Sequence, residues 1–210
     1  MANALIINSS ALGEASVSNK LTREFADSLK AADPSLEIKL RDVGKEPVPH
    51  LTAETVGAIR GDAETAEARE TLALSEVLIE ELEEADLLVI GSPMYNLGIS
   101  STLKTWFDHV VRAGVTFRYT AEGKSEGLMT GKKKAVVIES RAGFYSEGPA
   151  SGMDSQEPHL RNLLGFIGIT DVTFVRAEKL AFGPEAAAAA VEAAAAEFQA
   201  LSRKELALAA

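Results

Sequence analysis

The sequence predicts an α/β protein, a three-layer sandwich whose core is one five-stranded parallel sheet with helices on both faces. Five short segments have the apolar or alternating pattern of strands, and stretches with helical periodicity separate them. Such an alternation produces parallel strands that are joined by right-handed crossovers. No repeat and no linker divides the chain, so we expect a single domain over residues 1–210.

The first three elements are a buried strand, a helix and an edge strand. Residues 4–8 form a short apolar run, as a central parallel strand requires. Leu21, Phe25 and Leu29 recur every four residues and predict a helix from about residue 18 to residue 32. Apolar and charged residues alternate over 36–43, which predicts a half-exposed edge strand.

The middle of the chain begins with a segment that has no clear periodicity. Residues 44–65 contain Pro47, Pro49, Gly57 and Gly61, so we expect a long surface excursion with at most a short helix. A helix over 66–84, a buried strand over 86–91 and an amphipathic helix over 100–112 follow.

The last part of the chain repeats this alternation. A second excursion covers residues 113–130, and a buried strand is predicted over 135–139. A helix near 156–167 precedes the final strand over 172–176. The alanine-rich segment over 185–201 predicts a terminal helix, because alanine is the best helix former.

The strand order decides where a ligand would bind. In the order 2-1-3-4-5, strands 1 and 3 are neighbours, and their crossovers leave on opposite faces of the sheet. A crevice then opens at the carboxyl ends of these two strands. The loops that begin at Ser9 and Ser92 would form this crevice, with the loop at Ser140 beside it.

Composition excludes several classes of function. The formal net charge of −10 makes nucleic acid and anionic membrane surfaces poor partners. The chain has no cysteine, so thiol redox chemistry and thiolate metal sites are excluded, and any redox chemistry would need a cofactor. The three histidines are scattered, so we expect no metal site. With neither a secretory signal nor an apolar run of about 18 residues, we expect a cytoplasmic protein that does not span a membrane.

The first loop, residues 9–19, is rich in serine and leads into the first predicted helix. Free backbone N–H groups and the positive end of the helix dipole make such a turn an anion site. Serine hydroxyls add donors without adding charge, as an acidic protein that binds an anion requires. The alternative is that Ser18 only caps the helix and that the remainder is a polar loop.

Two further loops have residue types that suit the binding of a flat ring. They are the second loop, residues 91–98, and the third loop, residues 140–144. Proline and glycines fix the backbone of the second loop, Met94, Tyr95 and Leu97 offer apolar surface, and Asn96 offers a donor and an acceptor. The third loop adds hydroxyl and amide donors. Each loop alone is also compatible with an ordinary strand-to-helix turn. No Gly-x-Gly-x-x-Gly motif occurs, which disfavours a tightly held dinucleotide.

Three segments carry a resemblance to known proteins: Ser92–Asp108, Arg112–Thr120 and Leu164–Val172. They resemble the family of FMN-dependent NADH:quinone oxidoreductases and azo-compound reductases, which have a flavodoxin-like fold. The resemblance runs from residue 4 to about residue 184. At two positions the chain departs from the pattern, because the family often has Gly at position 142 and Phe at position 97.

The resemblance implies tightly bound FMN, NADH or NADPH as the transient electron donor, and a homodimer with each flavin near the subunit interface. It assigns the FMN phosphate and ribityl end to the first loop, the ring to the second loop and its pyrimidine edge to the third. It implies no side chain as an obligatory acid or base. The cofactor-binding residues are then Ser10, Ser16, Val17, Ser18, Pro93, Met94, Tyr95, Asn96, Leu97, Ser140, Arg141, Ala142 and Gly143, and Phe117, Tyr119 and Phe166 are candidates for the substrate pocket.

The function that the resemblance implies is two-electron, ping-pong reduction of quinones and azo compounds by NAD(P)H. Two alternatives stay open from the residues themselves. One is a flavodoxin-like electron carrier that holds FMN without turning over a substrate. The other is a flavin-free binding protein on the same fold, because a fold does not determine a function.

Overall fold

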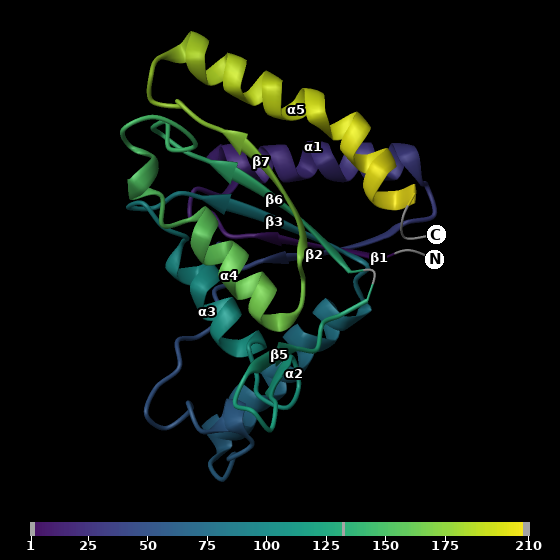
Figure 1. Ribbon diagram of the computed structural model, residues 1–210, viewed down its shortest axis with the longest axis vertical. Helices are drawn as coiled ribbons and strands as arrows, with labels where there is room; N and C mark the ends of the chain where they lie inside the picture. Colours follow the sequence, from purple (N-terminus) through teal and green to yellow (C-terminus); the bar gives the residue numbers. More distant parts are fainter. Residues whose placement is uncertain (1–2, 132, 208–210) are drawn as a thin grey trace.

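Figure 1 presents a computed structural model of the chain, which describes residues 3–131 and 133–207. The first two residues, on which the expectation of no secretory signal partly depends, lie outside the described residues. The main strands are β1 (Asn3–Asn8), β2 (Glu37–Asp42), β3 (Leu87–Pro93), β6 (Lys134–Ser140) and β7 (Asp171–Ala177). The helices are α1 (Val17–Ala32), α2 (Ala66–Glu84), α3 (Ser101–Val110), α4 (Glu157–Ile167) and α5 (Pro184–Ala207).

In the described part of the chain, the five main strands form one sheet in the order β2-β1-β3-β6-β7. Every neighbouring pair in this sheet is parallel. The predicted α/β class and the predicted order 2-1-3-4-5 are therefore confirmed. Strands β1 and β3 lie side by side, which is the arrangement for which a crevice at their carboxyl ends was expected.

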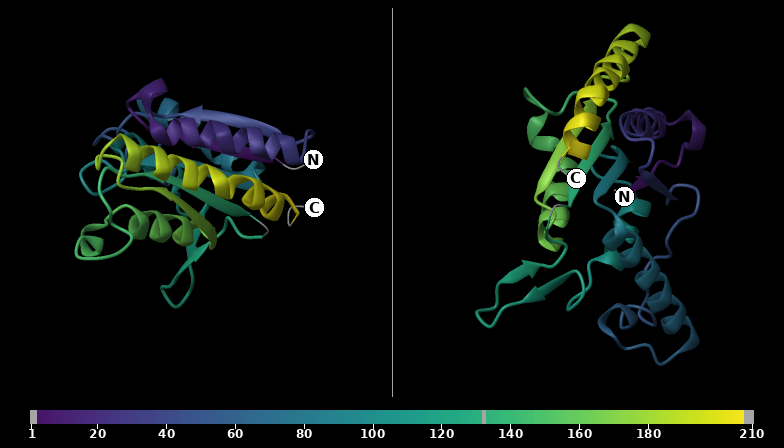
Figure 2. Two further views of the ribbon diagram at one scale, coloured as in Figure 1. Left: turned by 90° about the horizontal axis from the view of Figure 1, so that it is seen from above. Right: turned by 90° about the vertical axis from the view of Figure 1, so that its right-hand side faces the viewer.

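The helices form two layers around the sheet, as Figures 1 and 2 show. Helices α1 and α5 cover one face, and α2, α3 and α4 cover the other. Successive residues of a strand point to opposite faces, so Ile6 packs in the core beside α1 while Ile7 packs beside α2 and α3. Burial on both faces explains the continuous apolar run within each of the strands β1, β3 and β6.

Hydroxyl side chains begin three of the helices. Ser16, Thr65 and Ser100 accept a hydrogen bond from the first turn of α1, α2 and α3 respectively. The cap of α1 is thus Ser16, and the alternative that assigned this role to Ser18 is wrong. No helix in the described part of the chain combines the length and the apolar character that crossing a membrane requires.

The two excursions differ in structure. Residues 44–65 contain one short 3-10 turn, Ala58–Arg60, as predicted. Residues 113–130 fold into an antiparallel hairpin of β4 (Phe117–Tyr119) and β5 (Ser125–Gly127), which the sequence did not predict because each strand has only three residues. A Cβ on Gly127 would lie 2.1 Å from the backbone nitrogen of Gly168, so glycine allows the hairpin to pack closely on the end of α4.

Candidate functional site

The three predicted loops meet at the carboxyl ends of β1, β3 and β6, at the left edge of the sheet in Figure 1. The hydroxyl of Ser9 donates to the carbonyl oxygen of Gly91 over 2.7 Å, which joins the first loop to the second. The N–H of Met94 donates to the carbonyl oxygen of Ser140 over 2.9 Å, which joins the second loop to the third. The three loops therefore form one continuous surface.

The first loop presents a group of hydrogen-bond donors at the start of α1. The buried hydroxyls of Ser16 and Ser18 lie 3.0 Å apart. Among the described residues, the backbone N–H groups of Val17 and Ser18 have no hydrogen-bond partner. Free N–H groups at the positive end of a helix dipole attract anions. Since residues 9–19 contain no lysine or arginine, an anion here would be held by hydrogen bonds.

Tyr95 connects the second loop to the first. Its hydroxyl lies 3.2 Å from the Oγ of Ser10 and accepts a hydrogen bond of 3.1 Å from the N–H of Ala11. Its ring therefore spans the crevice between the ends of β1 and β3. The predicted residues Ser10 and Tyr95 are in direct contact.

The second loop turns through two residues with left-handed backbone conformation. Asn96 has φ 48° and Leu97 has φ 75°, and the turn is closed by a 2.9 Å hydrogen bond from the N–H of Tyr95 to the carbonyl oxygen of Gly98. Leucine rarely adopts this conformation, and such strain concentrates at functional sites. The N–H groups of Asn96 and Leu97 have no partner among the described residues.

The third loop offers a row of backbone donors. The carbonyl oxygens of Ala142 and Gly143 accept hydrogen bonds from Ala181 and Lys179, over 3.0 and 2.7 Å. Within the described ranges, the N–H groups of residues 142–144 remain without a partner. A Cβ on Gly143 would lie 2.8 Å from the ring of Tyr145, so any other residue at this position would have to displace that side chain.

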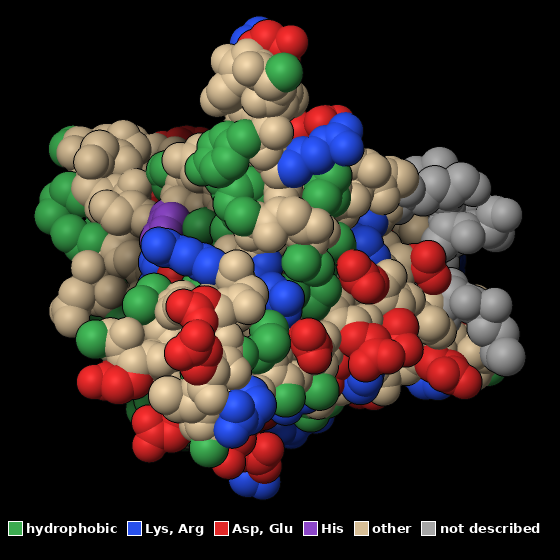
Figure 3. All heavy atoms as spheres, turned by 90° about the horizontal axis from the view of Figure 1, so that it is seen from below, with side chains coloured by type: hydrophobic (Ala, Val, Ile, Leu, Met, Phe, Trp, Pro, Cys, Tyr) green, Lys and Arg blue, Asp and Glu red, His purple; other side chains and the backbone are tan. Residues whose placement is uncertain are grey.

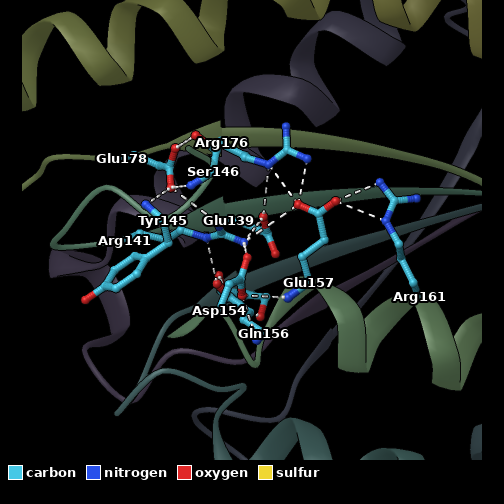
Figure 4. Close-up of polar contacts among 11 residues, drawn as sticks. Glu139, Arg141, Tyr145, Ser146, Asp154, Gln156, Glu157, Arg161, Arg176 and Glu178 are labelled. Carbon is cyan, nitrogen blue, oxygen red and sulfur yellow. Dashed lines mark hydrogen bonds and ion pairs between the residues drawn. The ribbon is translucent and has the colours of Figure 1, made fainter. Parts of the chain in front are cut away.

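The side chain of Arg141 lies away from the crevice. It is 0% exposed and is surrounded by acidic residues, as Figure 4 shows. Its guanidinium group donates to Glu139 over 2.6 Å and to Glu178 over 3.2 Å, and lies 3.0 Å from a carboxylate oxygen of Asp154. Arg141 was predicted as a cofactor-binding residue, but its side chain contacts protein groups.

This charged cluster is the main feature that sequence reasoning missed. Glu139 and Arg141 are two residues apart around the end of β6, a spacing that places side chains on one face of a strand. That spacing was the available signal. Burial raises the pKa of Glu139 to about 7, although the positive charge of Arg141 acts in the opposite direction.

The three predicted pocket aromatics lie together, but not at the loops of their own chain. The ring centroids of Phe117 and Phe166 are 4.5 Å apart, and those of Phe117 and Tyr119 are 5.5 Å apart. Phe166 lies at the end of α4, whereas the other end of this helix adjoins the second loop through the hydrogen bond from Ser155 to Leu97. An 11-residue helix is about 16 Å long, and this length separates the aromatic group from the crevice.

The donor set indicates which kind of ligand the crevice can hold. Backbone N–H groups and hydroxyls at the start of α1 suit an anionic group such as a phosphate. The backbone donors of the second and third loops suit the polar edge of a flat ring, and Met94 and Leu97 add apolar surface. Among the described residues, no group of three His, Cys, Asp or Glu side chains is arranged to hold a metal ion.

Comparison with known proteins places the chain in a family. A family model described as a flavodoxin-like fold matches residues 2–201. A curated relative from Hyphomonas neptunium, named FMN-dependent NADH:quinone oxidoreductase, is 51% identical over 91% of this chain and 91% of its own length. A relative from Pseudomonas aeruginosa, named FMN-dependent NADH:quinone oxidoreductase 3, is 49% identical over 88% of this chain and 85% of its own length.

Solved structures support the same family membership. An azoreductase from Bacillus anthracis matches with a TM-score of 0.88 at 31% identity, over 97% of this chain and 100% of its own. An FMN-dependent NADH-azoreductase from the same species, solved in complex with FMN, matches with a TM-score of 0.88 at 25% identity, over 97% of this chain and 99% of its own. The chain is a member of the flavodoxin-like family to which the FMN-dependent NADH:quinone oxidoreductases belong.

Proposed function

We propose that this protein binds FMN in the crevice and uses NADH or NADPH to reduce quinones and azo compounds. The observation that carries the proposal is the set of free backbone N–H groups and hydroxyls on three loops at the carboxyl ends of β1, β3 and β6. Family membership adds to it, because curated relatives at about half identity are named FMN-dependent NADH:quinone oxidoreductases. When bound, FMN would supply two-electron hydride chemistry.

The first loop would hold the phosphate. Two free N–H groups and two hydroxyls are available there, from Ser16, Val17 and Ser18. Ser10, in the same loop, lies beside the hydroxyl of Tyr95. This mode of binding needs no lysine or arginine, in agreement with the acidic balance of the chain.

The second and third loops would orient the ring. Pro93, Met94 and Leu97 provide apolar surface, while the N–H groups of residues 96, 97 and 142–144 remain available to polar atoms at the edge of the ring. Donors fixed in this way would favour negative charge at the pyrimidine edge without reorganising. Ser140 and Arg141 would act through the backbone path of the third loop, since the side chain of Arg141 is engaged in the charged cluster.

A homodimer would complete the substrate pocket. Tyr119 is 65% exposed on a hairpin that projects from the molecule, and apolar side chains gather at the base of this hairpin in Figure 3. Because Phe117, Tyr119 and Phe166 lie one helix length from their own crevice, a second copy of the chain is the natural source of aromatic walls above the ring. Each flavin would then lie near the subunit interface.

Donor and acceptor would use the same open face in turn, which gives ping-pong kinetics. The protein would act as a single domain over residues 1–210. It would work in the cytoplasm, and its lack of cysteine is compatible with a reducing compartment. Its side chains would bind and orient, with no obligatory acid or base among them.

The test is a visible spectrum of the purified protein, recorded before and after NADH and then benzoquinone. We expect a flavin spectrum that bleaches with NADH and recovers with the quinone, and parallel lines in steady-state plots. A protein that remains colourless with added FMN would contradict the proposal and favour a flavin-free binding protein. A stable semiquinone without oxidation of NADH would instead identify an electron carrier.

A further inference from the structure

One amide side chain joins the second and third loops. Gln156 is 0% exposed, and its Nε2 donates to the carbonyl oxygen of Ser92 over 2.8 Å and to the hydroxyl of Ser92 over 3.0 Å. Its Oε1 accepts a hydrogen bond of 3.0 Å from the Nε of Arg141. Gln156 therefore contacts the start of the second loop on one side and the third loop on the other.

The orientation of this amide is fixed by its partners. A guanidinium group can only donate, and a backbone carbonyl oxygen can only accept. Turning the amide over would place its NH2 group against the N–H of Arg141, so that two donors would meet. It would also place its oxygen against the carbonyl oxygen of Ser92, so that two acceptors would meet. The bridge between the loops thus has one allowed arrangement.

Arg141 extends the bridge to the far end of the third loop. Its guanidinium donates to Glu178, and the same carboxylate oxygen accepts the N–H groups of Tyr145 over 2.9 Å and Ser146 over 3.1 Å. Glu139 and Asp154 contact the other arm of the guanidinium. A planar guanidinium with five donors in a fixed fork holds these groups in a single geometry.

The segment before α4 adds a second connection to the second loop. The N–H of Ser155 donates to the carbonyl oxygen of Leu97 over 3.0 Å, so Ser155 and Gln156 hold the strained turn and the strand end together. Asp154 fixes this segment, because its carboxylate accepts the N–H of Gln156 over 2.8 Å and the N–H of Glu157 over 3.1 Å. Both loops are thereby attached to one buried group of polar side chains.

Burying so many charges disfavours folding unless the geometry is specific. The cluster in Figure 4 includes Glu139, Asp154, Glu157 and Glu178 against Arg141, Arg161 and Arg176, so it has one more acidic group than basic groups. An apolar core at this position would stabilise the sheet equally well, but it would not set the distance between the two loops.

The geometry points to Gln156 and Arg141 as positioning residues that set the spacing between the backbone donors of the second and third loops. This inference rests on the proposed function, in which those donors form the seat for the polar edge of the flavin ring. Gln156 and Arg141 would act through the loops and would not touch the cofactor.

Two substitutions at position 156 test the inference. Gln156→Glu keeps the shape and the acceptor toward Arg141, but it places an acceptor against the carbonyl oxygen of Ser92. Gln156→Met removes all three hydrogen bonds of the amide without adding a charge. For each variant loaded with FMN, we expect the dissociation constant for FMN to rise about tenfold or more. We also expect kcat to fall while the KM for NADH stays within about twofold, and the visible circular dichroism of the bound flavin to change.

The matched control is Glu205→Gln. Glu205 is buried and lies 2.9 Å from the Nζ of Lys134, at the amino ends of the strands. This substitution makes the same exchange of carboxylate and amide in a buried polar group, far from the crevice. We expect it to lower thermal stability without changing the affinity for FMN or the dichroism. Equal effects of the substitutions at positions 156 and 205 on FMN binding and dichroism would overturn the inference.

Hydrogen exchange on the flavin-free protein separates this inference from the proposed function. We expect Gln156→Met to accelerate exchange in peptides that cover residues 92–98 and 140–146, with no change over residues 3–8. Unchanged exchange in both loops would overturn the inference even if wild-type protein binds FMN and oxidises NADH. Failure of wild-type protein to take up FMN would instead count against the proposed function alone.

Discussion

The hydroxyl of Tyr95 lies 3.2 Å from the Oγ of Ser10, although 85 residues separate the two along the chain. The same hydroxyl accepts the N–H of Ala11 over 3.1 Å. This contact closes the crevice between the ends of β1 and β3 and connects the proposed phosphate seat to the proposed ring seat. Hydrogen bonds within the chain therefore join the two loops that border the crevice.

Removing this hydroxyl should loosen the crevice. In Tyr95→Phe, the ring remains but the bonds to Ser10 and Ala11 are lost, and a typical hydrogen bond contributes about 1 kcal/mol. We expect the dissociation constant for FMN to rise about fivefold or more, measured by quenching of flavin fluorescence. Ser75→Ala is the control, because it also removes a buried hydroxyl, which donates to the carbonyl oxygen of His109 near the end of α3 and lies outside the three loops. An equal loss in both variants would contradict this prediction.

The phosphate seat is tested at Ser18, because Ser16 also caps α1 and its removal would unsettle the helix. Ser18→Ala should weaken binding of FMN by about fivefold and leave binding of riboflavin, which lacks the phosphate, unchanged. Ser28→Ala, in the same helix with its hydroxyl bonded to the carbonyl oxygen of Glu24, should alter neither ligand. If Ser18→Ala weakened FMN and riboflavin equally, the phosphate would lie elsewhere.

Much of the fold could be predicted from the sequence because its pattern is periodic. Strand β3 contains a continuous apolar run, and helix α1 repeats its apolar side chains every four residues, so the elements and their parallel pairing follow from the pattern. The strand order itself was that of the flavodoxin-like fold. The β4–β5 hairpin could not be predicted, since a three-residue strand has no measurable period. The hairpin depends instead on packing at Gly127 against Gly168, which no local pattern indicates.

The site was predictable only where it consists of backbone and loop residues. The loops follow the strands in sequence, so Ser10, Ser18 and Tyr95 could be assigned before the structure. The charged cluster could not, because Arg141 meets Gln156 and Glu178 from 15 and 37 residues away. A buried arginine also looks like a surface arginine when only the sequence is read.

The strained turn at Leu97 predicts an effect of backbone conformation on stability. Its φ of 75° is unfavourable for any residue with a Cβ, at a cost of about 1 kcal/mol or more. Leu97→Gly and Leu97→Ala both remove the side chain, but only glycine relieves the strain. We expect the glycine variant to be the more stable of the two by about 1 kcal/mol in urea unfolding of the flavin-free protein.

Leu12 provides the control for this comparison. It is exposed and has an ordinary φ of −85°. There, Leu12→Gly should be no more stable than Leu12→Ala, because glycine gains nothing from a conformation that every residue adopts. If alanine were the better replacement at both positions, the turn at Leu97 would not be strained.

The charged cluster makes the stability depend on pH in opposite directions at two of its residues. Burial raises the pKa of Glu139 to about 7, above the ordinary 4.5, so its folded form retains a proton that the unfolded chain has lost. Burial also acts on Glu178, but hydrogen bonds from Ser146, Tyr145 and Arg141 outweigh it and lower the pKa of that carboxyl. As the pH rises from 4.5 to 7, Glu139 therefore lowers the free energy of unfolding. Glu178 raises that free energy as the pH rises toward its unfolded pKa.

Two glutamine substitutions should separate these contributions. Glu139→Gln removes a group whose ionisation opposes folding, so the free energy of unfolding of the variant should gain on that of the wild type as the pH rises from 4.5 to 7.5. Glu178→Gln removes a group whose ionised form is stabilised in the folded protein. The free energy of unfolding of this variant should therefore fall further below that of the wild type as the pH rises, and the loss should be greatest above the unfolded pKa. Urea unfolding of all three proteins at four pH values over this range measures both trends. Every other carboxyl titrates in all three proteins, so most of the remaining pH dependence cancels in the differences. A difference for Glu139→Gln that stayed constant with pH would mean that the pKa of Glu139 is the same in the folded and the unfolded protein, and a difference that moved the opposite way would mean that Arg141 stabilises its charge.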